Sequence, residues 1–173
     1  MAPEKMTERF MLDALKRRYT ANGGNGDRWI RAEHVRNGTG FYGYDRESGR
    51  CTSWLRTADF IALDGWESKS HVVHGHEVKI SRSDWLTELK DPEKAEAFRP
   101  YCDYWWLVVS DVKIVRLDEL PAGWGLMARV GEGDQLRVVR QAKKIDREPL
   151  PWPMVVGLTR AVQKTALRAG AVA

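Results

Sequence analysis

The stretch His71-Val-Val-His-Gly-His-Glu-Val-Lys-Ile-Ser-Arg-Ser-Asp-Trp85 predicts a strand that runs directly into a helix. On an extended strand, side chains two residues apart project from the same face, so Glu77 and Lys79 converge on one spot. Ser81 is followed three residues later by Asp84, a pattern typical of the first turn of a helix. The stretch therefore predicts a carboxylate and an ammonium side by side where a strand passes into a helix.

A second acid comes from the preceding strand-like segment. Residues 54–63 contain Asp59 among largely apolar neighbours, and a short polar loop joins them to the stretch above, as in a hairpin. If the two strands pair, Asp59 reaches the spot shared by Glu77 and Lys79. Two carboxylates beside one lysine suit Mg²⁺ or Mn²⁺ and a phosphodiester, because the metal takes oxygen ligands while the lysine orients an attacking water.

The composition predicts one globular domain without a membrane segment. Of 173 residues, 43% are hydrophobic and 30% are charged, and the apolar runs are too short to span a bilayer. The first residues are charged and lack the apolar core of a signal peptide, so the cytoplasm is the expected location. Cys51 and Cys102 have no Cys-x-x-Cys spacing and are expected to be free thiols. A net charge of +4 permits an acidic polymer as partner without requiring one.

The rest of the chain predicts helices and strands around this centre. The expected elements are a helix that ends near residue 20, a strand at 29–35, two short helices at 81–100, a buried strand at 104–110, a hairpin at 126–139 and a helix at 154–169. On the last helix, Arg160, Lys164 and Arg168 share one basic face, and such faces are more often solvated than bound to nucleic acid.

The predicted order is helix, strand, strand with Asp, strand with Glu-x-Lys, helix, strand. This order resembles the core of the PD-(D/E)XK nuclease superfamily, with Asp59 as its first acid and Glu77-Val-Lys79 as the second half of its motif. Ala58 stands where the name of the superfamily has proline. Within residues 8–140, three strings resemble its MmcB-like DNA-repair branch: Glu77-Val-Lys-Ile-Ser-Arg-Ser-Asp-Trp-Leu, Cys102-Asp-Tyr-Trp-Trp-Leu-Val-Val and Leu120-Pro-Ala-Gly-Trp-Gly-Leu.

This resemblance implies a fold and an activity. The implied fold is a restriction-endonuclease-like α/β core over residues 1–145, a central mixed β-sheet flanked by helices in the order αβββαβ, with an added C-terminal hairpin and helix. The implied activity is hydrolysis of DNA phosphodiester bonds in repair or recombination, with Mg²⁺ or Mn²⁺ as cofactor. DNA is the implied partner, and a homodimer is left open. Residues 146–173, a connector and a helix packed on the domain or extending from it, lie outside the resemblance.

The resemblance also implies roles for four residues. Asp59 and Glu77 correspond to metal ligands, and Lys79 corresponds to the lysine beside the attacking water. In many superfamily members a glutamate on the first helix joins the ligands, and Glu8 is the matching position. A helical wheel at about 100° per residue places Glu8 inside the apolar stripe of that helix. Fraying of the helix or a neighbouring arginine explains that position as well as metal binding does.

Four further residues are candidates for contact with DNA. Arg82 follows the central strand and can grip a phosphate through two hydrogen bonds, although a helix start explains its position equally well. Trp66, in the polar loop before that strand, is a candidate for stacking on a base. Arg46 and Arg50 lie in an irregular glycine-containing segment, where solvated arginines are more common than phosphate contacts.

A histidine cluster is the competing feature of the central stretch. His74 and His76 share the strand face opposite Glu77, His71 points away, and no cysteine lies close by in sequence. Packing under the helices expected at 81–100, or contact with phosphate when protonated, explains these histidines better than a transition-metal site.

Two functions stay open on this sequence. In the first, Asp59, Glu77 and Lys79 form the centre of a nuclease. In the second, Glu77 and Lys79 are an ion pair, Asp59 is unrelated to them, and the protein is a non-cleaving module that binds DNA or a protein. Both strands look largely buried, and burial of three charges without a functional reason is costly. This cost favours the nuclease.

Overall fold

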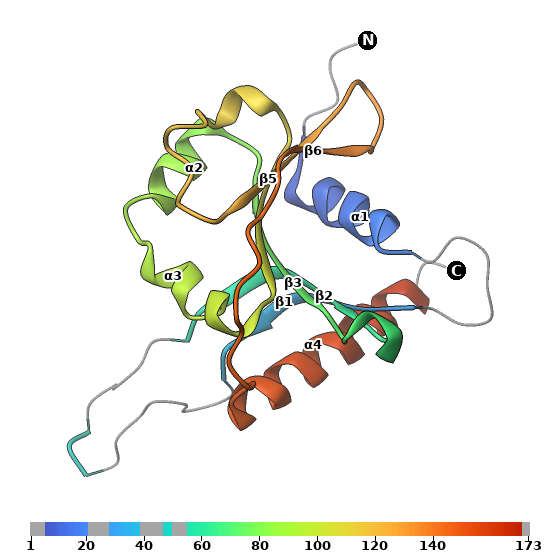
Figure 1. Cartoon of the computed structure of the whole chain (residues 1–173), viewed down its shortest axis with the longest axis vertical. Coiled ribbons are helices and arrows are strands. Elements are labelled where there is room, and N and C mark those ends of the chain that lie inside the picture. Colours follow the sequence, from blue (N-terminus) through green and yellow to red (C-terminus); the bar gives the residue numbers. More distant parts are fainter. Residues whose placement is uncertain (1–5, 21–27, 39–46, 50–54, 171–173) are drawn as a thin grey trace.

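A computed structural model describes residues 6–20, 28–38, 47–49 and 55–170 (Figure 1). Its centre is a six-stranded mixed sheet in the order β1-β2-β3-β4-β5-β6. β1 to β3 are antiparallel, β3 to β5 are parallel, and β6 is antiparallel to β5. The strands are β1 (Trp29–Arg36), β2 (Thr57–Asp64), β3 (Val73–Lys79), β4 (Tyr104–Val109), β5 (Gly125–Arg129) and β6 (Leu136–Arg140).

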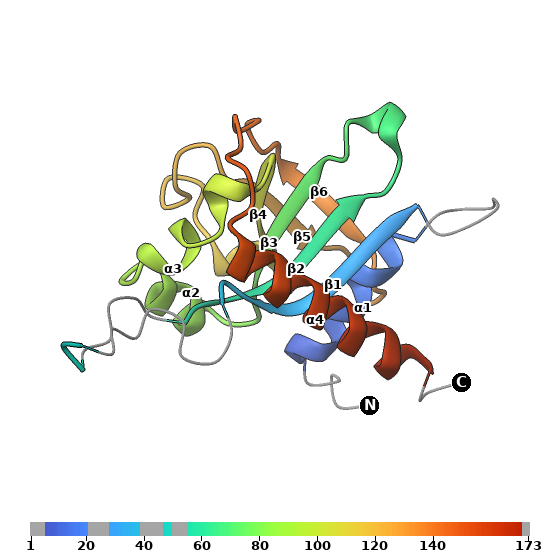
Figure 2. The same cartoon turned by 90° about the horizontal axis from the view of Figure 1, so that it is seen from below.

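Helices cover both faces of this sheet (Figure 2). α1 (Glu8–Arg18) packs on one face, whereas α2 (Arg82–Glu88), α3 (Glu93–Glu96) and α4 (Trp152–Gly170) pack on the other. Three short 3₁₀ turns complete the described chain: η1 (Glu67–Lys69), η2 (Arg99–Tyr101) and η3 (Val112–Ile114). The expected mixed sheet flanked by helices is therefore confirmed. Within the described ranges, no helix is both long and apolar enough to cross a bilayer.

Side chains alternate along the end of β3, so its apolar residue Val78 and its charged residues point to opposite faces of the sheet. Val78 packs against α1 and the aromatic residues of that face. Its neighbours Glu77 and Lys79 point to the other face, toward α2 and α3. The strand passes into α2 through Ser81, whose Oγ accepts a hydrogen bond from the backbone N–H of Asp84 at 3.2 Å. The predicted strand-to-helix junction is present.

The start of α3 differs from its prediction. The sequence Asp91-Pro-Glu predicts Asp91 as the capping residue. Pro92 takes the N-cap position without a side-chain hydrogen bond, and the Asp91 carboxylate instead contacts Arg56, with its Oδ2 at 2.6 Å from Nη1. The ion pair ties the loop before α3 to the start of β2.

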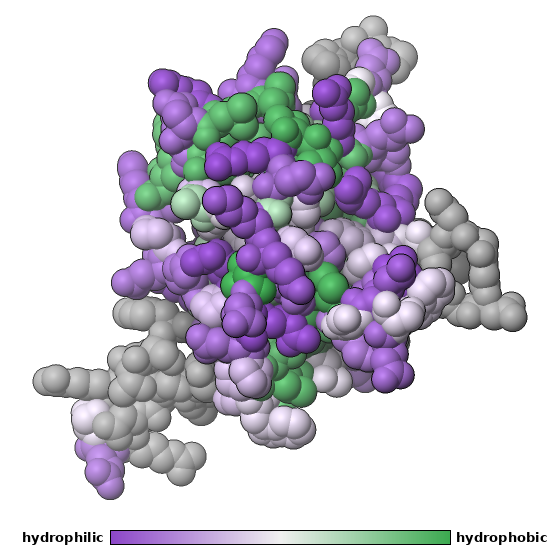
Figure 3. Space-filling view, viewed as in Figure 1, coloured by the Kyte–Doolittle hydropathy of each residue, from purple (hydrophilic) through white to green (hydrophobic). Residues whose placement is uncertain are grey.

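The apolar surface of the α2 side lies away from its charged residues. Figure 3 shows apolar side chains that gather over α2 and η3, and Leu86, Val112 and Leu117 are exposed there. Leu86 and Glu88 lie about 200° apart around the α2 axis. α2 therefore presents an apolar side to solvent and an acidic side to the sheet.

The histidines of β3 pack under α1, not under the helices of residues 81–100 as predicted. His76 is fully buried and contacts the Tyr19 hydroxyl at 2.9 Å and the Phe60 carbonyl at 3.2 Å. The indole N–H of Trp106 donates to His74 Nδ1 at 3.1 Å. Burial lowers the pKa of His74 to about 4 and that of His76 well below its ordinary value. Both rings are neutral parts of the core.

One cysteine can be compared with its prediction. Cys102 is a buried free thiol, as predicted, and burial raises its pKa to about 12. Cys51 lies outside the described residues.

We expect acid to destabilise the protein through His74. Its pKa is about 6.5 in the unfolded chain and about 4 in the folded protein, so the unfolded chain binds the proton first. The contribution of neutral His74 is complete above pH 6.5 and is lost as the pH falls toward 4. Urea titrations should show the free energy of unfolding falling more steeply for the wild type than for His74→Gln, by up to about 1.4 kcal/mol per pH unit.

The variant is the necessary control, because Glu77 titrates in the opposite sense. Burial raises the pKa of Glu77 to about 8, so its protonation stabilises the folded protein as the pH falls from 8 to 4.5. That contribution is common to both proteins and cancels in the difference. Parallel curves for the two proteins would contradict the role given to His74.

α4 approaches β1 closely at a glycine. A Cβ atom at Gly157 would lie 2.2 Å from the Arg36 carbonyl oxygen, which belongs to the backbone of β1. Met154 and Ala161, on the same side of α4, are buried in the core. The absence of a side chain at Gly157 thus allows the helix to lie against the edge strand of the sheet.

We expect Gly157→Ala to lower the free energy of unfolding by about 1–2 kcal/mol. Alanine favours the helix by about 1 kcal/mol, but overpacking costs about 1–3 kcal/mol, and an approach of 2.2 Å to a backbone oxygen belongs to the upper part of that range. Gly170→Ala, at the end of the same helix, is the matched control because nothing lies within 4 Å of the added Cβ. Chemical denaturation should show a loss for the first variant only; an equally stable Gly157→Ala would mean that the helix can move away at no cost.

Candidate active site

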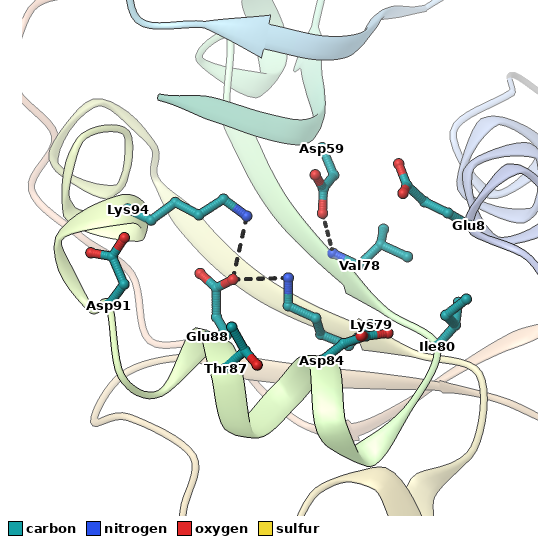
Figure 4. A pocket seen from close by; sticks show the side chains of 10 residues that line it. All are labelled: Glu8, Asp59, Val78, Lys79, Ile80, Asp84, Thr87, Glu88, Asp91 and Lys94. Carbon is teal, nitrogen blue, oxygen red and sulfur yellow. Dashed lines mark hydrogen bonds and ion pairs between the residues drawn. The ribbon is translucent and has the colours of Figure 1, made fainter. Parts of the chain in front are cut away.

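A cavity of about 520 Å³ opens at the carboxyl end of β3 (Figure 4). Five carboxylates and two lysines supply its charged lining, which comes from α1, β2, β3, α2, α3 and the segment between α2 and α3. The residues that line it are Glu8, Asp59, Val78, Lys79, Ile80, Asp84, Thr87, Glu88, Asp91 and Lys94.

Two glutamates and two lysines form an ion cluster at the base of this cavity. Lys79 Nζ lies 2.5 Å from Glu77 Oε1 and 2.8 Å from Glu88 Oε2. Lys94 Nζ, from α3, contacts the same oxygen of Glu77 and lies 3.3 Å from Glu88 Oε2. Only 1% of the Glu77 side chain and 11% of the Lys79 side chain are exposed. The four charges therefore compensate one another in a largely dry environment.

Asp59 is held beside this cluster by the backbone of the neighbouring strand. Its Oδ2 accepts a hydrogen bond from the backbone N–H of Val78 at 2.8 Å. Burial, together with the negative charge of Asp59, raises the pKa of Glu77 to about 8. Burial alone would lower the pKa of Lys79, but Glu77 and Glu88 outweigh it and raise that pKa above its ordinary value. Lys79 is therefore a stable cation, whereas Glu77 is an acid whose charge is disfavoured.

Glu8 belongs to the acidic side of the cavity, and His34 lies beside it. Glu8 is the first residue of α1, and its carboxylate lies 3.8 Å from His34 Nε2. Glu8, His34 and Asp59 each offer one ligand atom, and these atoms lie within 4.8 Å of one another. Glu8 does lie on the helix face that turns to the sheet. Its side chain is 51% exposed rather than buried, because the first turn overhangs the cavity.

His34 has an unusual backbone conformation for a strand residue. Its φ of 51° is in the left-handed region, which costs a residue other than glycine about 1–2 kcal/mol. It lies in β1 opposite Asp59 of β2, between the paired residues Glu33 and Val35. The unfavourable backbone conformation accompanies the position of the imidazole beside Glu8 and Asp59.

The sequence prediction missed Glu88, Lys94 and His34. A usable signal existed for Glu88, because Asp84 and Glu88 are four residues apart and therefore lie on one side of the predicted helix. Lys94 gave no such signal, since its position depends on the bend between α2 and α3. His34 depends on a local backbone conformation that its neighbours in sequence do not indicate.

Arg82 and Trp66 lie in the predicted segments, at the start of α2 and in the loop before β3, but outside the cavity, and their contact with DNA stays a prediction. The Arg82 guanidinium holds both carboxylate oxygens of Glu119 at 2.5 Å and is not among the described residues that line the cavity. Trp66 follows the far end of β2, and five residues at about 3.3 Å each separate Asp59 from Asp64, the last residue of that strand. Arg28 lies over its ring, 5.0 Å from the centroid. Neither residue is placed to contact a substrate in the cavity.

Two other predicted residues cannot be compared with the structure. Arg46 and Arg50 lie outside the described residues. Their predicted contact with phosphate stays a prediction.

The donor set suits a divalent cation. Asp59 uses one oxygen for Val78 and has a second one available, and Glu8 is exposed toward it. Burial and the neighbouring charge of Asp59 raise the pKa of Glu77, so additional positive charge beside these two acids would be favourable. Carboxylates favour Mg²⁺ or Mn²⁺, whereas the imidazole of His34 favours a transition metal. The residues therefore fit a cation without selecting Mg²⁺ over Mn²⁺.

Comparison with known proteins gives a fold without a function. No protein-family model and no curated protein matches the chain. Among solved structures, it is similar to one described as "SPO1766 protein of unknown function from Silicibacter pomeroyi", with a TM-score of 0.56 and 17% sequence identity. The similarity covers 99% of this chain and 92% of that chain. At this identity the similarity shows a shared α/β fold alone.

We expect Mn²⁺ or Mg²⁺ to stabilise the protein through Asp59. A ligand that binds only the folded state stabilises it by about 2.7 kcal/mol at one hundred times its Kd. Asp59→Asn should abolish the rise in melting temperature, because the amide keeps an oxygen for the Val78 N–H but removes the charge. Asp118→Asn is the control, since Asp118 is an exposed acid paired with Arg116. An equal shift in Asp59→Asn, or no shift in the wild type, would refute a cation site at Asp59.

Proposed function

We propose that the protein is a divalent-metal-dependent DNA nuclease with a restriction-endonuclease-like core, acting in DNA repair or recombination. The observation that carries this proposal is that Asp59, Lys79 and Glu8, from three separate elements, line one cavity, with the buried Glu77 in contact with Lys79 behind it. The chain order α1, β1, β2, β3, α2, β4 supports the same proposal. So does the resemblance of the motif that contains Glu77 and Lys79.

The residues have separable tasks in this reaction. Asp59 and Glu8, with Glu77 behind them, hold the cation. A bound divalent cation offsets the negative charge of the phosphodiester and makes a water easier to deprotonate. Lys79 does not act as the base, because the neighbouring carboxylates raise its pKa and keep it protonated. Its N–H groups donate to the attacking water or to the phosphate oxygen on which charge develops.

Lys94 and Glu88 position the catalytic residues. Lys94 contacts the same oxygen of Glu77 as Lys79 does, and Glu88 binds both lysines. Through these contacts Glu88 would hold both ammonium groups at the cavity, and both lysines would hold Glu77 behind the residues that bind the cation.

One observation favours a second function, a non-cleaving module that binds DNA or a protein. The ion cluster of Glu77, Lys79, Glu88 and Lys94 satisfies its own charges and can serve stability alone. Two features support the nuclease against it. Glu8 and His34 have no part in that cluster, yet they lie beside Asp59. A purely structural cluster also has no need of Asp59, whose negative charge raises the pKa of the buried Glu77.

We expect cleavage of labelled single-stranded, duplex or branched DNA with Mg²⁺ or Mn²⁺, and none with EDTA. Lys79→Met keeps most of the apolar stem but removes the ammonium group, so cleavage should fall by about 10²–10³-fold. Lys90→Met is the matched control, because Lys90 is exposed and does not line the cavity. If the protein binds DNA but gives no product with any substrate and metal, the non-cleaving module is favoured. If Lys79→Met cleaves at the wild-type rate, the catalytic role of Lys79 is refuted.

A further inference from the structure

A second cavity, of about 420 Å³, lies between β1 and α4, which run beside each other (Figure 2). We call it the β1–α4 groove. Arg36 on β1 and Arg160, Lys164 and Arg168 on α4 contribute four positive charges to its lining, and Glu33 contributes one carboxylate. The cavity of the candidate active site has the opposite balance, with five carboxylates and two lysines. The two cavities therefore differ in the sign of their charge.

The single acid of the groove is already neutralised. Both oxygens of Glu33 bind the Arg9 guanidinium, at 2.6 and 2.7 Å, and Arg168 Nη1 lies 3.2 Å from Oε2. Arg36, Arg160 and Lys164 are exposed and have no carboxylate partner among the described residues. Within the part of the chain that the structure describes, no acid occupies these three cations, and they can bind an anion.

The packing of α4 brings these cations together. Gly157 lets the helix lie against the Arg36 carbonyl, so the basic side of α4 faces the basic end of β1. Arg160, Lys164 and Arg168 recur every fourth residue and span about 12 Å along the helix. At a rise of about 3.4 Å per nucleotide, this length corresponds to three or four nucleotides of one strand. If the basic face of α4 were only solvated, there would be no reason for Arg36 of β1 to line the same groove.

His34 connects the groove to the candidate active site. It lines the β1–α4 groove and also lies with Glu8 and Asp59, within 4.8 Å between ligand atoms. We propose that the β1–α4 groove binds the phosphodiester backbone of a nucleic acid strand and directs it past His34 to the acidic cavity. The second half of this proposal rests on the proposed nuclease function, whereas binding in the groove does not.

The shape of the site favours a nucleic acid strand over an anionic membrane surface. The cations line a hollow between a helix and a strand, which a flexible chain of phosphates can enter and a flat layer of headgroups cannot. The acidic cavity at the end of the groove would also repel an extended anionic surface. A strand can pass from the basic groove to the acidic cavity and meet there the cation that the carboxylates hold.

The test measures binding in EDTA, so that cleavage plays no part. The probe is a short fluorescent DNA oligonucleotide, single-stranded or duplex, titrated with the full chain between about 50 and 200 mM salt. Arg160→Gln with Lys164→Gln removes two free cations of the groove, and both side chains are exposed. Lys143→Gln with Lys144→Gln is the matched control, because it removes the same charge from exposed residues outside the groove.

We expect the groove variant to bind at least about tenfold more weakly at low salt than the wild type and the control. The slope of log K against log salt should become shallower by about 1.4–1.8, since each lost phosphate contact removes about 0.7 on single strands and 0.9 on duplex DNA. A second pair of measurements with phosphatidylserine vesicles tests the membrane alternative.

Three results would overturn the proposal: no DNA binding by the wild type, unchanged affinity and slope in the groove variant, or groove-dependent binding to vesicles without binding to DNA. The failure of the nuclease is distinguishable from these. Absence of cleavage with groove-dependent binding of DNA would refute the catalytic role and leave the groove intact. If cleavage is lost in Lys79→Met but is equal in the groove variant and the wild type, the catalytic role of Lys79 stands. The role of the groove in directing the strand to the cavity is then refuted.

Discussion

The buried contact between Lys79 and Glu77 at the end of β3 is the constraint on which the site depends. Removal of these charges from water costs several kcal/mol for each ion, and the pair alone does not satisfy every donor and acceptor. Glu88 from α2 and Lys94 from α3 supply the missing partners. The two short helices after β3 are thus tied to the site by charge as well as by Trp85 and Ala95 in the core.

The opposite side of the same strand has a different role. Val78 packs with α1, while its backbone N–H holds Asp59 at the cavity. α1 in turn brings Glu8 to the cavity, and β1 brings His34 through an unfavourable backbone conformation. One residue of β3 therefore links the apolar core under α1 to the position of an acid from the neighbouring strand.

Charge is divided between two neighbouring hollows. The acidic cavity suits a cation and the basic β1–α4 groove suits phosphate. His34 lines the groove and lies beside Glu8 and Asp59, which line the cavity. A cation held by carboxylates and a polyanion held by arginines would meet at this boundary. α4, which the superfamily resemblance does not cover, supplies most of the basic side. This division is the physical reason to consider α4 part of the functional surface.

The sequence by itself determined most helices and strands and singled out Asp59, Glu77 and Lys79, because periodicity, capping patterns and strand alternation are local properties. The strands, the hairpin of β5 and β6, α2 and α4 could be predicted in this way, and so could the shared face of Glu77 and Lys79. The corrections depend on contacts between residues far apart in the sequence: His74 and His76 lie beside Tyr19 under α1, and Asp91 binds Arg56 instead of capping α3. Only the tertiary structure identified Lys94, His34 and Arg36. Lys94 reaches the site because the chain bends between α2 and α3, and His34 does so in a left-handed backbone conformation. Arg36 faces the basic side of α4 because the helix approaches β1 at Gly157.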